Sequence, residues 1–323
     1  MNVGIISTSA IVPWFVESLK SYPTVHIKAI YSRNADKAKP VAEQYHIDTI
    51  YTDLEEMLSD PELDTIYLTS PNSLHYSQAK QALLHGKNVI NEKPFAATLS
   101  QAEELFEIAE EKDVRLFDMS ISREYDRYLF IKEHMAELGK IRLFKDNQSQ
   151  YSRRYDAFAA GETPNVFNPE MEGGALMDLN VYNIALTVLL FGKPEQVFYV
   201  ANVERGIDTT GELILKYPEM LAETCTSKST SSQNMILVQG EKGFLSMEKP
   251  SRGNGGCKYV KLNNGEKQEF DLPLSIQNME RIVKCVDEGD ASVYEREKEV
   301  VLAIVDILEK ARHCAGIVFP SDR

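Results

Sequence analysis

The stretch NVGIISTSAIVPWF, residues 2–15, passes from a short apolar run through a polar turn into a second apolar segment. This order predicts a buried β-strand, a dinucleotide-binding turn and a helix. Such a turn prefers three glycines, because they allow a tight bend, close approach of pyrophosphate and close packing of helix on strand. Here those places hold Ser7, Ser9 and Val12. A side chain forced into a left-handed backbone conformation costs about 1–2 kcal/mol, so the turn alone is weak evidence for nucleotide binding.

The sequence around this turn predicts a doubly wound α/β domain over residues 1–118. Short β-rich runs alternate there with amphipathic helical segments, which is typical of βαβ units and a parallel Rossmann sheet. Asn34 and Ser73 are the expected N-caps of two of these helices, over residues 34–46 and 73–86. The expected strands are residues 2–6, 26–31, 64–70, 87–91 and 114–118.

After residue 118 the pattern changes, which predicts a second domain over residues 119–323. A helix over 125–138 is followed by strands without intervening helices, as in an α+β domain built on a mostly antiparallel open sheet. A final helix, about 295–313, is expected to pack back on the first domain. Residues 251–256 are expected to form a hairpin connection. The expected strands are residues 141–152, 195–204, 211–217, 221–228 and 234–240.

The bulk composition favours a small-molecule partner. The formal charge of −14 disfavours nucleic acid and anionic lipid, which call for clustered lysine and arginine. No apolar run is expected to cross a membrane, which takes about 20 residues. The four cysteines are widely spaced and no histidine stands at metal-ligand spacing, so we predict no metal site. Free thiols fit a reducing compartment, and a cytoplasmic location is expected.

The end of the second predicted strand bears on the choice of cofactor. Ser32 and Arg33 stand where an NAD-specific domain usually places an acidic residue against the ribose hydroxyls. An arginine there can pair with a 2′-phosphate, so NADP is favoured and NAD stays possible. The alternative is an ordinary solvated loop arginine.

Two longer stretches resemble the Gfo/Idh/MocA oxidoreductases. TSPNSLHYSQAKQALLHGKNVINEKPFAATLSQAEEL, residues 69–105, matches that family's TPN-x-x-H strand end, GK-x-V strand and E-K-P loop. EGGALMDLNVYNIALTVLLFGKP, residues 172–194, is similar to its signature GGGAL-x-D-x-G-x-H, with Tyr182 in place of histidine. That tyrosine resembles the subset with glucose-fructose oxidoreductase and dimeric dihydrodiol dehydrogenase. SREYDRYLFIKEHMAELGKI, residues 122–141, matches the segment that opens the second domain, so the resemblance covers nearly the whole chain.

The resemblance implies hydride transfer between a nicotinamide and a carbinol or carbonyl carbon of a sugar, polyol or diol. It implies a nicotinamide between the two domains, over the E-K-P loop, and a homodimer through the second-domain sheet. The catalytic residues that it implies are Lys93, Asp178 and Tyr182, which converge on the substrate hydroxyl. An ammonium beside a phenol favours phenolate, so Lys93 and Tyr182 would form an acid–base pair oriented by Asp178.

Further site residues follow partly from the resemblance and partly from the residue pattern itself. Arg123 and Tyr155 are expected to bind substrate with Asp178 and Tyr182, although an aromatic-basic cluster such as residues 151–155 is more often a solvated strand end. The residues expected to bind cofactor are Ser7, Thr8, Ser9, Ala10, Ile11, Ser32, Arg33, Thr69, Pro71, Asn72, His75, Glu92 and Lys93.

Three features of the sequence leave alternatives open. His75 fits a structural role at the start of the next helix as well as a functional one. Asn180 stands where the family usually has glycine, which puts the local backbone in doubt. Together with the missing glycines of the turn, it motivates a second hypothesis, a non-catalytic relative that binds nucleotide or sugar. If the turn still binds pyrophosphate, Ser9→Gly is expected to tighten binding more than Ser7→Gly.

Overall fold

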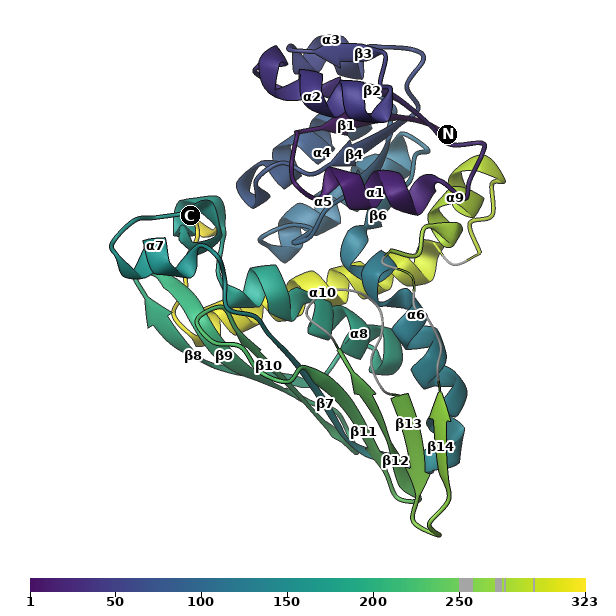
Figure 1. Cartoon of the computed structure of the whole chain (residues 1–323), viewed down its shortest axis with the longest axis vertical. Helices are drawn as coiled ribbons and strands as arrows, with labels where there is room; N and C mark the ends of the chain where they lie inside the picture. The colour runs from purple at the N-terminus through teal and green to yellow at the C-terminus, as the bar shows by residue number, and fades with distance from the viewer. Residues whose placement is uncertain (250–257, 271–274, 276, 293) are drawn as a thin grey trace. The chain divides into compact units, whose positions relative to one another are not determined.

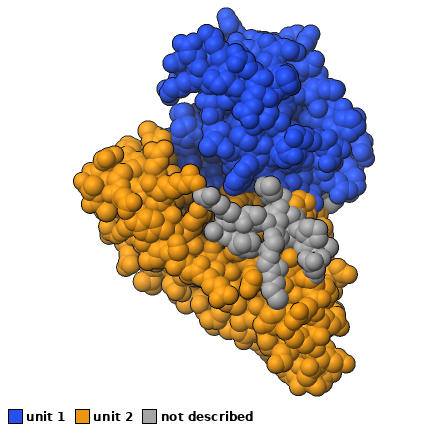
Figure 2. Space-filling model, viewed as in Figure 1, with its two compact units in different colours: residues 1–122, 277–302 blue, residues 123–276, 303–323 orange. Residues whose placement is uncertain are grey.

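The computed structural model describes residues 1–249, 258–270, 275, 277–292 and 294–323, which form two compact units. Unit 1 comprises residues 1–122 and 277–302, and unit 2 comprises residues 123–276 and 303–323 (Figure 2). The helix α10, Tyr294–Cys314, therefore contributes to both units. The predicted hairpin connection over 251–256 lies outside the described residues.

Unit 1 is built on a six-stranded parallel sheet with strand order β3-β2-β1-β4-β5-β6, which confirms the doubly wound prediction (Figure 1). The order reverses between β1 and β4, and this is where such sheets bind ligands at their carboxyl edge. The strands are β1 Asn2–Ile6, β2 His26–Tyr31, β3 Thr49–Tyr51, β4 Thr65–Leu68, β5 Asn88–Asn91 and β6 Leu116–Asp118. The helices are α1 Val12–Leu19, α2 Ala35–Tyr45, α3 Leu54–Leu58, η1 Asn72–Leu74, α4 His75–Leu84, α5 Leu99–Glu111 and α9 Glu280–Asp287.

One of the two predicted helix caps is confirmed and the other is wrong. The Asn34 side chain accepts a hydrogen bond from the Asp36 N–H at 2.9 Å, as an N-cap should. Ser73 does not cap α4, because the chain already turns in the 3₁₀ helix η1 and the serine lies inside that turn. The N-cap of α4 is Leu74, which makes no side-chain cap bond.

Unit 2 is built on an eight-stranded sheet, as far as its described residues go, with order β14-β13-β12-β11-β7-β10-β9-β8. Among these strands β7 and β10 pair in parallel and the other neighbours pair antiparallel, which confirms a mostly antiparallel sheet. The strands are β7 Ile141–Ser149, β8 Gln196–Glu204, β9 Ile207–Lys216, β10 Leu221–Ser227, β11 Met235–Gly240, β12 Gly243–Glu248, β13 Lys258–Leu262 and β14 Lys267–Phe270.

Helices cover one face of this sheet and leave the other face open (Figure 1). Along β8 the exposed Phe198 and Val200 flank the buried Tyr199, the alternation expected of a sheet with one solvated face. The helical elements are α6 Met119–His134, η2 Met135–Leu138, α7 Tyr155–Ala159, η3 Asn165–Phe167, η4 Pro169–Met171, η5 Leu176–Asn180, α8 Val181–Phe191, α10 and η6 Pro320–Asp322.

The stretch Pro169–Phe191 is long and apolar enough, by length and composition, to cross a membrane. No such stretch was predicted, because polar residues interrupt the apolar run. In the structure 83% of its most apolar window is buried in the protein. The core helix of a folded domain passes the same test, and α8 fills that place between the sheet and its neighbours in unit 2.

Candidate functional site

The turn after β1 is held by backbone hydrogen bonds and bends at Ser7. Ser7 has a φ of 97°, a left-handed conformation that favours glycine, and its N–H donates to the Tyr31 carbonyl at 3.0 Å. The Ser9 hydroxyl accepts from the Ile11 N–H at 3.4 Å, and the Ser9 carbonyl accepts from the Val12 N–H at 3.1 Å. The helix α1 begins at Val12, so the turn leads directly into a helix N-terminus, which attracts phosphate.

A cavity of about 440 Å³ opens beside this turn, at the carboxyl edge of the unit 1 sheet. The lining residues come from the ends of β1, β2 and β4 and from the helices that follow, which is where a dinucleotide lies in this fold. They are Ile6, Ser7, Thr8, Tyr31, Ser32, Arg33, Asn34, Lys37, Ser70, Pro71, Leu74 and Gln78. The predicted cofactor residues that are not among them are Ser9, Ala10, Ile11, Thr69, Asn72, His75, Glu92 and Lys93.

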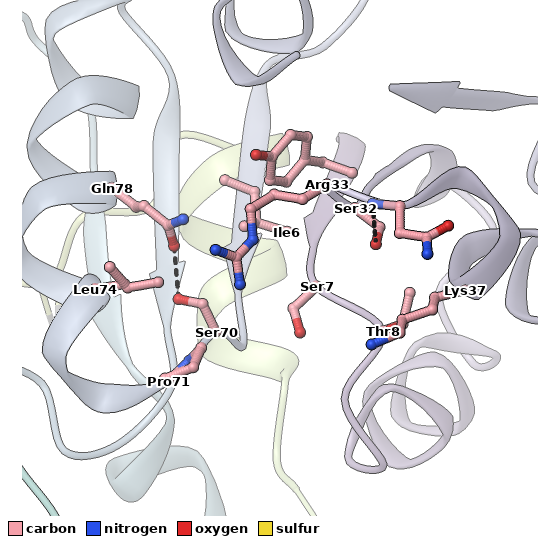
Figure 3. Close-up of a pocket in the computed structure, with 12 residues that line it drawn as sticks. Ile6, Ser7, Thr8, Ser32, Arg33, Lys37, Ser70, Pro71, Leu74 and Gln78 are labelled. Atoms are coloured by element: carbon pink, nitrogen blue, oxygen red, sulfur yellow. Dashed lines mark hydrogen bonds between the residues drawn. The ribbon is translucent and has the colours of Figure 1, made fainter. Parts of the chain in front are cut away.

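The charge of this cavity fits a nucleotide with an extra phosphate. Arg33 and Lys37 are exposed, and none of the lining residues that the structure describes is acidic. Figure 3 shows the Arg33 guanidinium reaching into the cavity toward Ser70 and Gln78, with Lys37 beside Thr8. Lys37 was not among the predicted residues. A second basic residue soon after Arg33, in the first turn of α2, was the available signal.

The E-K-P loop follows β5, and the side chain of its glutamate, Glu92, is buried inside unit 1. The Glu92 carboxylate accepts from the Tyr67 hydroxyl at 2.8 Å and from the Lys93 N–H at 3.2 Å. The Tyr67 ring in turn stacks on Phe15, with ring centroids 3.7 Å apart. Glu92 therefore orients the loop from inside, and its contact with the cofactor stays a prediction.

His75 connects the end of β4 to the E-K-P loop. Its ring nitrogens lie 2.8 Å from the Pro94 carbonyl oxygen and 2.9 Å from the Ser70 carbonyl oxygen. The ring is fully buried, and this burial lowers the pKa of His75. The structural alternative for His75 is therefore supported, because its ring connects the end of β4 to the loop that carries Lys93. A direct contact of the ring with cofactor stays a prediction.

In unit 2 the signature segment begins as a π-helix, Leu176–Asn180, which leads into α8. Isolated π-turns are frequent at functional sites. The Leu176 N–H donates to the Asp208 carboxylate at 2.7 Å, and the Tyr199 hydroxyl donates to the same oxygen at 2.8 Å. Burial raises the pKa of Asp208. These bonds attach the start of the segment to β8 and β9.

Asn180 removes the doubt that the missing glycine had raised. Its φ of −68° and ψ of −21° are helical, so no glycine is needed there. The Asn180 side-chain oxygen accepts from the Asn183 amide at 2.9 Å. Asn183 accepts from the buried Lys249 ammonium at 2.9 Å, and Lys249 pairs with Asp146 at 2.9 Å. The buried polar network of Asn180, Asn183, Lys249 and Asp146 thus anchors the signature segment.

Tyr182 and Asp178 each contact a cation in unit 2. An Arg123 nitrogen donates to the Tyr182 hydroxyl at 3.2 Å, and its guanidinium carbon lies 4.5 Å from the centre of the Tyr182 ring. Asp178 forms an ion pair with Lys228, which follows β10. Lys228 was not among the predicted residues, and its only signal was its place at the polar end of a predicted strand.

Tyr155 reaches the same region through aromatic contacts. Its ring centroid lies 5.9 Å from that of Phe167, and the Lys228 ammonium lies 5.5 Å from the Phe167 centroid. Unit 2 therefore brings Arg123 to Tyr182, and it connects Tyr155 to Asp178 through Phe167 and Lys228. Lys93 belongs to unit 1, and its joint action with Asp178 and Tyr182 stays a prediction.

One acidic cluster lies elsewhere in the part of the chain that the structure describes. Ligand atoms of Glu309, His313 and Asp322 all lie within 4.8 Å of one another. Asp322 already accepts two hydrogen bonds from the buried Arg312, at 2.7 and 3.0 Å. The arginine beside it makes this a structural ion pair and gives no support to a metal site.

Comparison with known proteins identifies the family. Residues 1–119 match the model of an oxidoreductase family with an NAD-binding Rossmann fold, and residues 131–246 match the GFO/IDH/MocA C-terminal domain. A scyllo-inositol 2-dehydrogenase (NADP⁺) of Bacillus subtilis, IolU, is 32% identical over 333 residues, covering 100% of this chain and 99% of that protein. The chain belongs to the Gfo/Idh/MocA oxidoreductase family. The resemblance seen in the motifs is confirmed.

Other relatives agree with this Gfo/Idh/MocA assignment. A trans-1,2-dihydrobenzene-1,2-diol dehydrogenase of Mus musculus is 26% identical, over 99% of this chain and 98% of that protein. The solved structure of KijD10, a 3-ketoreductase from Actinomadura kijaniata in complex with NADP and TDP-benzene, superposes with a TM-score of 0.82. It is 22% identical, with 98% of each chain covered, and it shows the shared fold.

Proposed function

We propose that this oxidoreductase uses NADP and acts on a CH–OH group, or the matching carbonyl, of a sugar, polyol or diol. The observation that carries the cofactor assignment is the cavity that presents Arg33 and Lys37 and no described acidic residue. A 2′-phosphate adds negative charge at that edge of the sheet, and guanidinium and ammonium groups bind it. The relatives named above, a polyol dehydrogenase and a diol dehydrogenase, support the substrate class.

NADP, when bound, supplies the hydride chemistry, and the side chains of this chain move the proton. With a carbinol substrate bound, Tyr182 or Lys93 would take the hydroxyl proton during oxidation, and the same group would return a proton to the carbonyl oxygen during reduction. Arg123 donates to the Tyr182 oxygen and so helps to orient the phenol. The Asp178 side chain is more exposed than that of its partner Lys228, which supports a role for Asp178 as an acceptor from a substrate hydroxyl.

We propose that the chain forms a homodimer through the open face of the unit 2 sheet. Phe198 and Ile214 are cross-strand partners on this face, and Val200 and Leu221 are exposed close by on β8 and β10. Large apolar side chains gathered on one solvated sheet face are typical of an interface between subunits. Phe198→Asp is expected to give a monomer in light scattering, whereas Lys140→Met, at an exposed ion pair, should leave the assembly unchanged.

We also propose a cytoplasmic location. Cys225, Cys285 and Cys314 are free thiols among the residues that the structure describes, which supports a reducing compartment. Fractionation of the native cells with an antibody tests this, and recovery in an extracytoplasmic fraction would contradict it.

A screen of inositols, hexoses and vicinal diols with NADP⁺, read as absorbance of the reduced nicotinamide, tests the proposed reaction. We expect turnover with at least one polyol or diol, and faster turnover with NADP⁺ than with NAD⁺. If NADPH raises the melting temperature of the protein but neither the alcohols nor their ketones react, the non-catalytic, nucleotide-binding alternative holds instead.

A further inference from the structure

We infer that Lys228 is a positioning residue that holds the Asp178 carboxylate in its working orientation. This inference rests on the proposed function, in which Asp178 contacts the substrate. The two residues are far apart in the chain and come from different elements, the π-helix Leu176–Asn180 and the end of β10. Their ion pair joins the signature segment to the sheet.

The two members of this pair differ in exposure. The Lys228 side chain is 5% exposed, whereas the Asp178 side chain is 28% exposed. The Asp178 side chain is thus the more accessible member of the pair, and the Lys228 side chain is the buried one. A substrate hydroxyl can reach Asp178 without displacing Lys228.

Lys228 is itself fixed on several sides. Its N–H donates to the Thr209 carbonyl at 2.8 Å, and its carbonyl accepts from the Ser152 N–H at 2.9 Å. Its ammonium lies 5.5 Å from the centre of the Phe167 ring, a distance typical of a cation–π contact. A flexible lysine stem usually loses much rotamer freedom in an ion pair, but here the backbone and an aromatic ring already limit that freedom.

A second buried lysine shows what a purely structural pair looks like in the same unit. The side chains of Lys249 and Asp146 are 3% and 0% exposed, so neither can meet a substrate. Both Asp146 oxygens accept from Lys249, at 2.9 and 3.1 Å. In the Lys228–Asp178 pair, by contrast, the acidic side chain is 28% exposed. This difference assigns a positioning role to Lys228 and an anchoring role to Lys249.

The test is a double-mutant cycle on the full-length protein with the polyol or diol found in the screen. Lys228→Met is expected to lower kcat at least tenfold, with KM for the cofactor and Kd for NADPH within about twofold of the parent values. Lys228→Arg should recover most of the loss. Asp178→Asn should lower kcat further, and adding Lys228→Met to it should change little, because residues that act as a unit are non-additive.

Lys140→Met is the matched control, since Lys140 forms an exposed ion pair with Glu219 in the same unit. A Lys228→Met enzyme with normal kcat, or losses that multiply in the double variant, would overturn the inference. If Lys228→Met strongly lowers the melting temperature of the protein, Lys228→Gln and Lys228→Arg replace it in the double-mutant cycle.

Crystal structures of the parent and of Lys228→Met separate this inference from the proposed function. We expect the Asp178 carboxylate to leave its place in the variant, and an unmoved carboxylate overturns the positioning role. This readout holds even if the parent shows no turnover with NADP, in which case the proposed function fails by itself.

Discussion

Ser7 and Asn180 both replace a glycine that relatives usually have, but the two positions differ in backbone conformation. Ser7 has a φ of 97°, which is costly for any residue with a Cβ. Asn180 has helical dihedral angles and bears no such cost. The missing glycine therefore causes backbone strain at Ser7, in the turn after β1, and none at Asn180, in the signature segment.

The surroundings of these two residues differ in the same way. Ser7 lies beside an open cavity whose charged groups, Arg33 and Lys37, are exposed. Asn180 is buried in a network with Asn183, which Lys249 in turn supports. The predicted cofactor side thus depends on exposed charges, whereas the predicted substrate side is fixed by buried hydrogen bonds.

The largest expected effect tests whether Lys93, on the cofactor side, and Tyr182, on the substrate side, act in the same reaction. Lys93→Met and Tyr182→Phe should each lower kcat by about 10²–10⁴-fold, the usual contribution of an acid–base group. The double variant should be little worse than either single one, because both side chains are proposed to act on one proton. Steady-state turnover with NADP, measured after circular dichroism has verified folding, checks this.

Lys80→Met is a suitable control for Lys93, since Lys80 forms a surface pair with Glu104 in unit 1. Normal kcat in Tyr182→Phe would remove Tyr182 from the chemistry. Losses that multiply in the double variant would mean that Lys93 and Tyr182 act separately.

The next effect tests how far the cofactor side depends on its exposed cations. Arg33→Ala and Lys37→Ala should each weaken NADPH binding by roughly 10- to 100-fold, the equivalent of a charge-assisted hydrogen bond of about 1.5–3 kcal/mol. NADH binding should change little, because NADH lacks the 2′-phosphate. Calorimetric titration with both nucleotides checks this prediction.

Lys39→Ala supplies the control, since Lys39 lies on the same helix, pairs with Asp36 and does not line the cavity. Equal losses for NADPH and NADH in Arg33→Ala would show that Arg33 contacts the shared part of the two nucleotides. The NADP preference would then need another source.

The sequence predicts the two sheets well because each follows from a local pattern. The predicted limits of β1 and β2 agree with the structure to the residue, since apolar runs in a parallel sheet are bounded by turn residues. The short strand β3 and the strands β12 to β14 were missed. β3 and β14 contain no buried residue, so no apolar run marks them. β12 and β13 pair with β11 and β14, which are close in the sequence, and their short alternating patterns were overlooked.

The residues of the candidate site that belong to sequence motifs were predictable. The cavity includes Ser7, Thr8, Ser32 and Arg33, which the turn and the strand end had indicated. Lys228 belongs to no motif, and only the pairing of β10 with its neighbours brings it to Asp178. A side chain that joins the site through tertiary structure alone leaves no local signal.

A smaller effect is expected from restoring glycine in the signature segment. Asn180→Gly should destabilise the protein by about 2 kcal/mol, since it loses the hydrogen bond with Asn183 and introduces a flexible residue at a helical position. Asn180→Ala is the matched variant, because it removes the same amide but keeps a good helix former. Chemical denaturation should place Asn180→Ala between the parent and Asn180→Gly. A glycine variant as stable as the parent would mean that the Asn180–Asn183 bond contributes nothing.

The smallest expected effect is the opposite response at Ser7. Ser7→Gly should relieve the left-handed strain of about 1–2 kcal/mol, partly offset by the greater freedom of glycine in the unfolded chain, for a net gain of roughly 0.5–1 kcal/mol. The sequence alone predicts the larger gain in NADPH affinity for Ser9→Gly, because the backbone was expected to approach the phosphate most closely there, and this stays a prediction. For stability the structure favours Ser7, because Ser9 is not among the described residues with positive φ and its hydroxyl accepts from the Ile11 N–H. Ser9→Gly should therefore lower stability slightly, and calorimetry with NADPH tests the predicted gain in affinity. Denaturation and calorimetry on the two variants together decide the point, since a larger stability gain for Ser9→Gly would show that the strain does not lie at Ser7.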